Sequence, residues 1–246
     1  MMGVNPAVNV SGLAPTTYSG GKMKILIIDL EKESFSYRED NNLRTQYLGG
    51  VALNTHLLYQ DTQRTINPFD SENHLFISCG ALTGTTIPTA SRCESTALSP
   101  TGYFGTSNSG GGIGAAIKFC GIDSIWVKGK STRPLYLLID EKGVHFKDAR
   151  DVWGKDTFQT VDTLKAREGK KAEIASIGPA GEKGVRFASI QNGYYHSFGR
   201  TGLGAVMGSK LLKAICFRGN ADIAVKDKKR LMKIVKKLRD RIMSSD

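Results

Sequence analysis

An internal repeat constrains the fold of this 246-residue chain more than any other feature of its sequence. Two segments that begin Gly-Ala-Ala-Ile and Gly-Ala-Val-Met match each other, and every matched pair lies 90 positions apart. The pairs are Ser107/Ser197, Gly112/Gly202, Gly114/Gly204, Ala115/Ala205, Ile125/Ile215, Lys128/Arg218 and Gly129/Gly219. We therefore expect two related halves with a pseudo-two-fold axis between them, and a ligand on that axis would meet two similar half-sites.

Hydrophobic patterning predicts strands and short helices in a similar order in both halves. The expected strands are 24–30, 75–79, 92–98, 124–127, 135–139, 144–146, 172–177, 185–190 and 214–217, and the expected helices are 48–59, 111–119, 156–167 and 202–212. At slightly larger offsets, Gly80 aligns with Gly178 and Arg92 with Arg186. The expected fold class is α+β: an internally duplicated, β-rich domain with a few short helices.

Composition limits the class of protein and its domain organisation. An apolar fraction of 40% is typical of a globular chain, and no stretch approaches the roughly 20 apolar residues that span a bilayer. Residues 1–22 lack the features of a secretory signal or a transit peptide, so we expect a flexible leader there. The domain itself is expected over 23–219, and a linker followed by a basic helix over 220–246.

The C-terminal segment carries much of the net charge of +11, because Lys226–Asp246 holds nine Lys or Arg against three Asp. Such a segment is compatible with nucleic-acid or membrane binding. However, apolar residues recur at helical spacing at Leu231, Ile234, Val235, Leu238 and Ile242. This spacing favours an amphipathic helix whose apolar side meets another helical region, with neither nucleic acid nor a membrane as partner.

Several kinds of chemistry lack their sequence patterns. The four cysteines, Cys79, Cys93, Cys120 and Cys216, form no C-x-x-C element, so we expect core thiols in a reducing, cytoplasmic compartment. No G-x-S-x-G nucleophile elbow occurs. Gly110-x-Gly112-x-x-Ala115 is a weak dinucleotide fingerprint, because a turn rather than a strand precedes it.

Three loops of small, uncharged residues are candidate binding elements: 80–91, 99–112 and 196–204. The last two run into expected helices, where free backbone N–H groups favour an anion such as phosphate. The alternative is that their glycines only permit close helix packing. Arg92 and Arg200 favour the anion, since a guanidinium offers bidentate donors. His196 is the candidate contact among the four histidines.

Five ordered motifs give the chain a family resemblance. They are Gly80-Ala-Leu-Thr-Gly…Pro-Thr-Ala-Ser-Arg92, Ser99-Pro-Thr-Gly, Asn108-Ser-Gly-Gly, Ile174-Ala-Ser-Ile-Gly-Pro-Ala-Gly-Glu182 and Gly199-Arg-Thr-Gly-Leu-Gly-Ala-Val-Met-Gly-Ser-Lys210. From about Met23 to Gly219 the sequence resembles the N-terminal domain of tungsten-containing aldehyde ferredoxin oxidoreductases. The resemblance implies an α+β base with internal pseudo-two-fold symmetry that carries tungsten on two molybdopterins (tungstopterin), with magnesium bridging the pterin phosphates.

The resemblance also implies roles for residues at motif positions. Arg92 would sit between a pterin and a 4Fe-4S cluster, and Asn108 and Ser197 would lie near the magnesium, largely through backbone oxygens. Gly110 and Gly199 would let the backbone approach the phosphates. The remaining implied positions are Arg200 and Lys210, as support for the loop, and His196, which stands where many family members have Arg.

The expected function is the cofactor-binding N-terminal part of an enzyme that oxidises aldehydes to carboxylic acids and passes electrons through an iron–sulfur cluster to ferredoxin. Cluster ligands and acid/base residues would lie in helical domains that follow, or in a partner subunit, so the chain alone is expected to be inactive. A homodimer is left open. The alternative is a non-catalytic module that binds a phosphorylated ligand or an assembly partner through Arg92, Arg200 and the basic tail.

Overall fold

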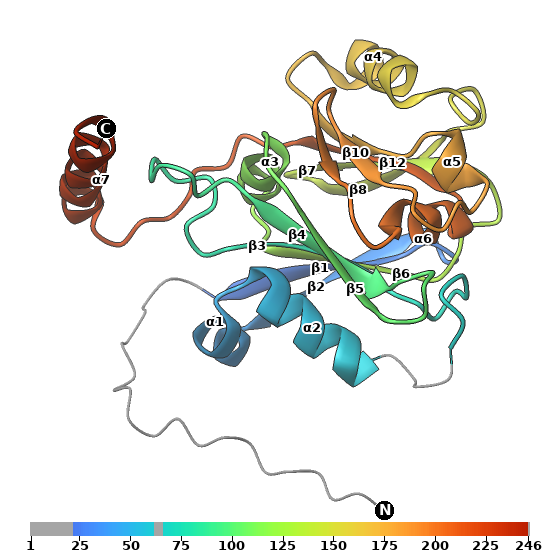
Figure 1. The fold of residues 1–246 in the computed structure, drawn as a ribbon, viewed down its shortest axis with the longest axis horizontal. Helices are drawn as coiled ribbons and strands as arrows, with labels where there is room; N and C mark the ends of the chain where they lie inside the picture. The colour runs from blue at the N-terminus through green and yellow to red at the C-terminus, as the bar shows by residue number, and fades with distance from the viewer. Residues whose placement is uncertain (1–21, 62–65, 246) are drawn as a thin grey trace, which may run out of the picture.

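The computed structural model describes residues 22–61 and 66–245, which form two six-stranded sheets and the helices around them (Figure 1). The first sheet has the order β2-β1-β6-β3-β4-β5. Its strands are β1 (Met23–Asp29), β2 (Ser34–Asp40), β3 (Leu75–Cys79), β4 (Cys93–Leu98), β5 (Phe104–Ser109) and β6 (Ser124–Lys128). Residues 1–21 of the expected leader lie outside the described residues.

The second sheet repeats the first. Its order is β11-β10-β9-β12-β7-β8, and its strands are β7 (Leu135–Asp140), β8 (Gly143–Asp148), β9 (Glu173–Ser176), β10 (Ile190–Asn192), β11 (His196–Phe198) and β12 (Leu212–Arg218). The order β8-β7-β12-β9-β10-β11 is that of the first sheet, strand for strand. The directions agree as well, because β1–β6 and β7–β12 are the parallel pairs and all other neighbours are antiparallel. The predicted duplication is confirmed.

Counterparts meet across the molecule, as a pseudo-two-fold axis requires. Strand β5 contacts its counterpart β11, and β2 contacts its counterpart β8. At the second contact the ring of Phe35 lies so close to Gly143 that a Cβ there would be 2.4 Å from it.

The helices form layers inside and outside the two sheets (Figure 1). The counterparts α3 (Ile113–Phe119) and α6 (Leu203–Ser209) each contact both sheets, within the largest apolar cluster. On the outer faces, α1 (Asn41–Tyr47) and α2 (Gly50–Asp61) cover the first sheet, and α4 (Thr157–Glu168) covers the second. The Asp156 carboxylate caps the start of α4, because it accepts the Gln159 N–H at 2.8 Å. Short α5 (Pro179–Glu182) follows β9.

The repeated glycines have a shared packing role. A Cβ at Gly114 would lie 2.4 Å from the Ser91 carbonyl oxygen, and one at Gly204 would lie 2.3 Å from that of Ser189. Gly114 therefore lets α3 approach the residues that lead into β4, and Gly204 lets α6 approach those that lead into β10.

Hydrogen-bonded registers correct two of the pairings expected between the halves. Outward from Ile125 the partners are Ile77, Ser95 and Ser107, and outward from Ile215 they are Ala175, Asn192 and His196. Ser107 is thus the counterpart of His196, and Asn108 is the counterpart of Ser197. The same register makes Ser189, rather than Arg186, the counterpart of Arg92, because the edge strands begin at different distances from the matched core.

Several elements differ from the sequence expectation. Most of the expected strand 185–190 is turn or irregular structure, and β10 starts only at Ile190. Strands β2, β5 and β11 and helix α1 were not predicted. The β5 sequence FGTSNS contains few strand-forming residues, and it is held as a strand by pairing along β4.

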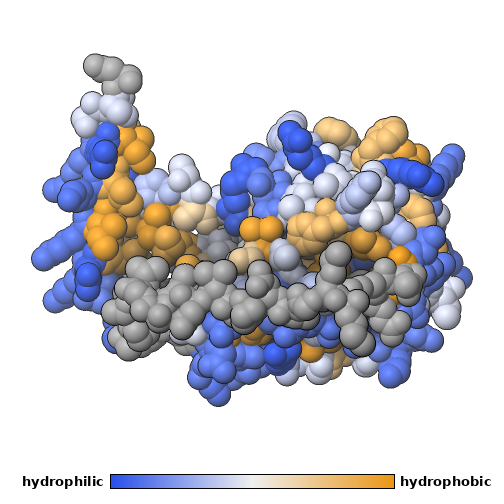
Figure 2. Space-filling view, turned by 60° about the horizontal axis from the view of Figure 1, so that its bottom comes forward, coloured by the Kyte–Doolittle hydropathy of each residue, from blue (hydrophilic) through white to orange (hydrophobic). Residues whose placement is uncertain are grey.

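Beyond the duplicated domain, the expected basic helix is α7 (Lys228–Met243), capped by the Asp227 carboxylate on the Arg230 N–H at 2.8 Å. Val235 is buried, whereas Ile234, Leu238 and Ile242 on the same stripe are exposed. Hydrophobic side chains form a column on α7 that faces the rest of the molecule, with hydrophilic side chains on the opposite side (Figure 2). None of the described helices is long and apolar enough to cross a membrane.

Candidate functional site between the two halves

The contact between β5 and β11 is a polar seam that joins the two halves. The side-chain amide of Asn192 donates to Ser109 Oγ at 3.1 Å and to the Gly110 carbonyl at 2.6 Å. Further along, the Arg200 backbone N–H donates to Ser107 Oγ at 3.1 Å. These bonds fix segments about 90 residues apart beside each other.

A cavity of about 430 Å³ opens on this seam. Its walls come from β4 and β5 of the first half and from β11 and the turn after it in the second half. The lining residues are Arg92, Glu94, Thr106, Ser107, Asn108, Ser197, Gly199 and Arg200. The lining holds two guanidinium groups, one carboxylate and a series of neutral oxygen donors, a set suited to a phosphate-bearing guest.

Five of the residues singled out in the sequence therefore line one cavity: Arg92, Asn108, Ser197, Gly199 and Arg200. Arg92 is held in place because its Nε donates to Asn108 Oδ1 at 3.0 Å and its Nη2 donates to the same oxygen. The Arg200 side chain is exposed and has no hydrogen-bond partner among the described residues. One guanidinium is thus fixed and the other is free to adjust.

Gly110 and His196 lie beside the cavity rather than among its lining residues. A Cβ at Gly110 would be 3.6 Å from His196 Nδ1 and 3.8 Å from Arg92 Nη1. At Gly111, where φ is +77°, a Cβ would be 2.7 Å from the His196 ring. The run of glycines therefore accommodates the imidazole of His196, which is exposed.

The starts of α3 and α6 do not line the cavity, contrary to the expectation of an anion at a helix start. The Glu173 carboxylate lies next to Gly112 at the start of α3, 2.5 Å from the position of a Cβ there. A Cβ at Gly202, before α6, would lie 1.9 Å from the Arg186 carbonyl oxygen. Both helix starts are therefore taken up by packing.

Lys210 supports the fold at a distance from loop 196–204. It is fully buried, and its Nζ donates to the carbonyl oxygens of Ser71 at 3.1 Å and Gly129 at 3.0 Å. Burial lowers the pKa of Lys210 to about 8. The four cysteines are buried and unpaired, as expected, and burial raises the pKa of Cys79 to about 12.

Sequence reasoning missed three residues of the cavity: Glu94, Thr106 and Ser107. Segment 99–112 was interpreted as a loop, and a loop gives no basis for deciding which side chains share a face. The sequence holds no signal for them, because FGTSNS contains few strand-forming residues and pairing with β4 decides which side chains share a face.

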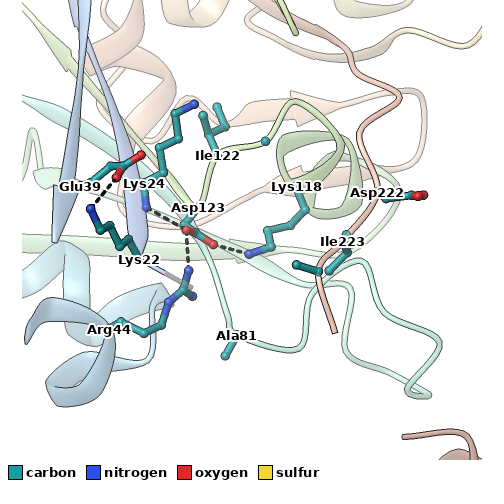
Figure 3. A pocket seen from close by; sticks show the side chains of 12 residues that line it. Lys22, Lys24, Glu39, Arg44, Ala81, Lys118, Ile122, Asp123, Asp222 and Ile223 are labelled. Carbon is teal, nitrogen blue, oxygen red and sulfur yellow. Dashed lines mark hydrogen bonds and ion pairs between the residues drawn. The ribbon is translucent and has the colours of Figure 1, made fainter. Parts of the chain in front are cut away.

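A second cavity, of about 380 Å³, surrounds the buried carboxylate of Asp123 (Figure 3). Asp123 accepts from the Lys24 backbone N–H at 2.9 Å, from Arg44 at 2.5 Å and from Lys118. Burial opposes ionisation of this carboxyl, but Arg44 and Lys118 outweigh burial and lower its pKa. Because Arg44, Lys118 and the Lys24 backbone N–H are all directed at Asp123, this cluster ties α1, α3 and β1 together as a structural ion group.

Comparison with known proteins gives the class first. Residues 25–219, which form the two sheets and their helices, match the family model of the aldehyde ferredoxin oxidoreductase N-terminal domain. The chain belongs to the aldehyde ferredoxin oxidoreductase family and contains its N-terminal domain.

Individual relatives agree with this assignment. The chain is 42% identical over 199 residues to the tungsten-containing aldehyde ferredoxin oxidoreductase of Pyrococcus furiosus, which covers 80% of this chain and 33% of the relative. It is 31% identical to an aliphatic sulfonate oxidoreductase, WOR-like subunit, of the same organism, over 86% of this chain and 36% of the relative.

Among solved structures, the active site complex BamBC of benzoyl coenzyme A reductase, in complex with 1,5-dienoyl-CoA, matches with a TM-score of 0.87 and 34% identity. The match covers 89% of this chain and 34% of that chain. The chain thus spans about a third of the length of the relatives it matches. Tungsten-containing relatives imply a tungsten-pterin cofactor for the family to which it belongs.

Proposed function

We propose that this chain is the cofactor-binding part of an enzyme that oxidises aldehydes to carboxylic acids, with the seam cavity as the floor on which a tungsten bis-pterin cofactor rests. The observation that supports the proposal is the convergence of Arg92, Asn108, Ser197, Gly199 and Arg200 on one cavity between two related halves. A guest with two similar arms matches a floor that is assembled from two related halves, each of which contributes an arginine. The comparisons do not favour the alternative of a non-catalytic module.

The donor set of the cavity fits such a guest. Guanidinium groups bind phosphate oxygens in bidentate fashion, and oxygen atoms are the ligands that magnesium prefers. In our proposal, Asn108 and Ser197 would offer backbone oxygens to a magnesium ion that accompanies the pterin phosphates. The cavity lining contains no cysteine, which agrees with a metal held by the dithiolene sulfurs of its own cofactor.

When bound, the cofactor supplies the chemistry: a two-electron oxidation of an aldehyde with water. The residues of this chain bind and orient. Arg92, fixed by Asn108, holds a permanent positive charge at one side of the cavity, and Arg200 closes on phosphate from the other. Gly110 and Gly199 leave the backbone accessible, and His196 contributes a polar ring at the edge.

The rest of the enzyme lies, in this proposal, outside residues 23–219. The 4Fe-4S cluster ligands and the acid/base residues would come from following helical domains or a partner subunit, and electrons would leave to ferredoxin. The linker and α7, within 220–246, would begin the next helical region. A cytoplasmic location is part of the proposal, since all four thiols are buried and unpaired.

The test is cofactor capture by the chain produced in cells supplied with tungstate. We expect tungsten and pterin to co-purify with it, and the Arg92→Ala/Arg200→Ala double variant to retain at least about tenfold less of both, because charged hydrogen bonds to phosphate are lost. Arg186→Ala, an exposed arginine outside the cavity, is the matched control. Equal tungsten in all three proteins would contradict the proposal, as would aldehyde-dependent reduction of viologen by the chain alone.

A further inference from the structure

Glu94 stands out in the seam cavity because it places a negative charge where an anionic guest is expected. Its side chain is half-buried, and its hydrogen-bond partner among the described residues is the Thr106 hydroxyl, which donates to Oε1 at 2.6 Å. Arg92, two residues earlier, directs its guanidinium to Asn108 instead. The carboxylate is therefore not neutralised by an ion pair within the described chain.

A chain of hydrogen bonds from the buried interior fixes this carboxylate. The Asn54 side-chain nitrogen donates to Thr96 Oγ1 at 3.2 Å, and Thr96 Oγ1 lies 3.3 Å from Thr106 Oγ1. Since the amide nitrogen can only donate and the carboxylate can only accept, each threonine hydroxyl must donate toward Glu94. Asn54 and Thr96 are fully buried, so this order is protected from water.

The Asn54 amide is itself anchored in one orientation. Its nitrogen also donates to the Glu94 carbonyl oxygen at 3.1 Å, and its oxygen accepts from the Ser78 hydroxyl. A carbonyl oxygen can only accept, so the nitrogen must face β4. Backbone and carboxylate of Glu94 are thus positioned by one buried side chain, which is more support than an incidental surface glutamate receives.

The ladder places other oxygens beside this carboxylate. Asn108 lies directly opposite Glu94 on β5, and Ser197, the counterpart of Asn108 in the other half, lines the same cavity. A carboxylate among neutral oxygens is the environment of a hard divalent cation. With a cation between them, Glu94 and a phosphate group attract the same ion instead of repelling each other.

We propose that Glu94 is the carboxylate that couples a divalent cation to a phosphate-bearing guest in the seam cavity, positioned there by Thr106, Thr96 and Asn54. This inference rests on the proposed function, because it assumes that the cavity binds phosphate. Removal of the Glu94 charge should therefore weaken binding of the metal complex of the guest without weakening binding of the metal-free guest.

The experiment is calorimetric titration of the whole chain with inorganic pyrophosphate, once with EDTA and once as the Mn²⁺ complex. In the unmodified protein we expect Mn²⁺ to strengthen pyrophosphate binding about tenfold, a typical coupling between two ligands. In Glu94→Gln we expect that gain to vanish, while metal-free pyrophosphate binds as tightly as before or more tightly. Glu31→Gln, an exposed glutamate on another surface, should behave as the unmodified protein.

A second pair of variants tests the positioning chain. Thr106→Val removes the hydroxyl that donates to Glu94 and should lower the Mn²⁺ gain, and Thr106→Ser should restore it. Broadening of the Mn²⁺ EPR signal by the unmodified protein with pyrophosphate, but not by Glu94→Gln, is an independent readout.

Three outcomes would overturn the inference. Mn²⁺ gains that are equal in Glu94→Gln and the unmodified protein would exclude Glu94 as a ligand. A parallel loss of binding with and without metal would assign it a structural role only. Failure of the unmodified protein to bind pyrophosphate in either form would overturn this inference and contradict the phosphate-binding floor of the proposed function, whereas the first two outcomes leave that floor intact.

Discussion

The two halves of the domain share one framework but contribute different chemistry to the seam. Register assigns Ser189, Gln191 and Ser197 as the counterparts of Arg92, Glu94 and Asn108. The first half thus places a cation and an anion on the cavity wall at positions whose counterparts in the second half are neutral and do not line the cavity, and the second half adds Arg200 from the following turn. Duplication explains the shape of the cavity, while its charges come from changes made in one half at a time.

The buried charges show the same contrast. Asp123 in the first half accepts from two cations, and its counterpart Lys213 in the second half donates to Glu182 at 2.5 Å and to the Lys155 carbonyl at 2.8 Å. Equivalent positions before β6 and in β12 therefore bury opposite charges. What the repeat preserves is a buried, satisfied ion group rather than a particular residue.

The largest effect should come from removing the charge of the first ion group. Asp123→Asn leaves Arg44 and Lys118 buried without their carboxylate, and we expect a loss of about 3–5 kcal/mol in the free energy of unfolding. Asp151→Asn, which breaks the exposed pair with Arg167, should cost less than about 1 kcal/mol. Urea denaturation measures both, and equal losses would show that the Asp123 group is not a structural centre.

The same group predicts a pH dependence. The pKa of Asp123 is lower in the folded than in the unfolded state, so its stabilisation is present above the unfolded value near 3.8 and is lost as pH falls through the folded value. We expect the stability difference between the unmodified protein and Asp123→Asn to be constant above about pH 5 and to shrink below about pH 4. A difference that does not change with acid would contradict the assignment.

A smaller effect, of about 1–3 kcal/mol, is expected from alanine at either repeated glycine, because each new Cβ would meet a backbone carbonyl that cannot move easily. Gly114→Ala and Gly204→Ala should destabilise the protein to a similar extent, since their close contacts are 2.4 and 2.3 Å. Gly80→Ala, with its nearest contact at 3.6 Å, is the matched control. Unequal losses at the two glycines would break the equivalence of the halves at this point.

The difference between the two halves can also be measured as pyrophosphate affinity in variants that remain folded. Arg92→Ala should weaken metal-free pyrophosphate binding by about tenfold, the loss expected for a charged hydrogen bond, whereas Ser189→Ala should leave it unchanged. Calorimetry measures both affinities, and thermal melting confirms that neither variant is unfolded. If Ser189→Ala weakens pyrophosphate binding as much as Arg92→Ala, the two counterpart positions contribute equally to binding and the contrast between the halves is wrong.

The smallest effects are expected on α7, which has no counterpart in the repeat. Leu238→Ala and Ile242→Ala should change the stability of the chain by less than about 0.5 kcal/mol, because both side chains are exposed. If the whole enzyme buries this stripe, the same variants should weaken assembly there, which co-purification of the remaining domains or subunit would detect. A large loss of stability in the chain alone would mean that α7 packs more extensively on the domain.

Much of this fold could be predicted because the repeat is recorded in residues with strict packing roles. Gly114 and Gly204 match in sequence since each faces a backbone carbonyl that excludes any side chain. Strand β5 could not be predicted in the same way, because small polar residues become a strand there only through pairing with β4. Two pairings, Arg92/Arg186 and Ser107/Ser197, were wrong because the connections between strands differ in length in the two halves, so a sequence match does not fix the register there; Gly80/Gly178 agrees with the register.

The candidate site was predictable to the same degree. Arg92, Asn108, Ser197, Gly199 and Arg200 could be selected from motifs, and the structure places them around one cavity. Glu94 could not, since its significance depends on a neighbour in the ladder, Thr106, and on a buried amide in α2. Sequence motifs identify the residues that a family shares, whereas strand pairing in the structure identifies the residues that line the same side of a cavity.

Because the seam is assembled from two sheet edges, neither half can form the cavity by itself. Arg92 and Asn108 reach Ser197 and Arg200 only after both sheets have closed around α3 and α6. If the cofactor rests on this seam, as we propose, its loading should report on completed folding, because a chain whose second half is still open offers only one of the two arginines to the guest.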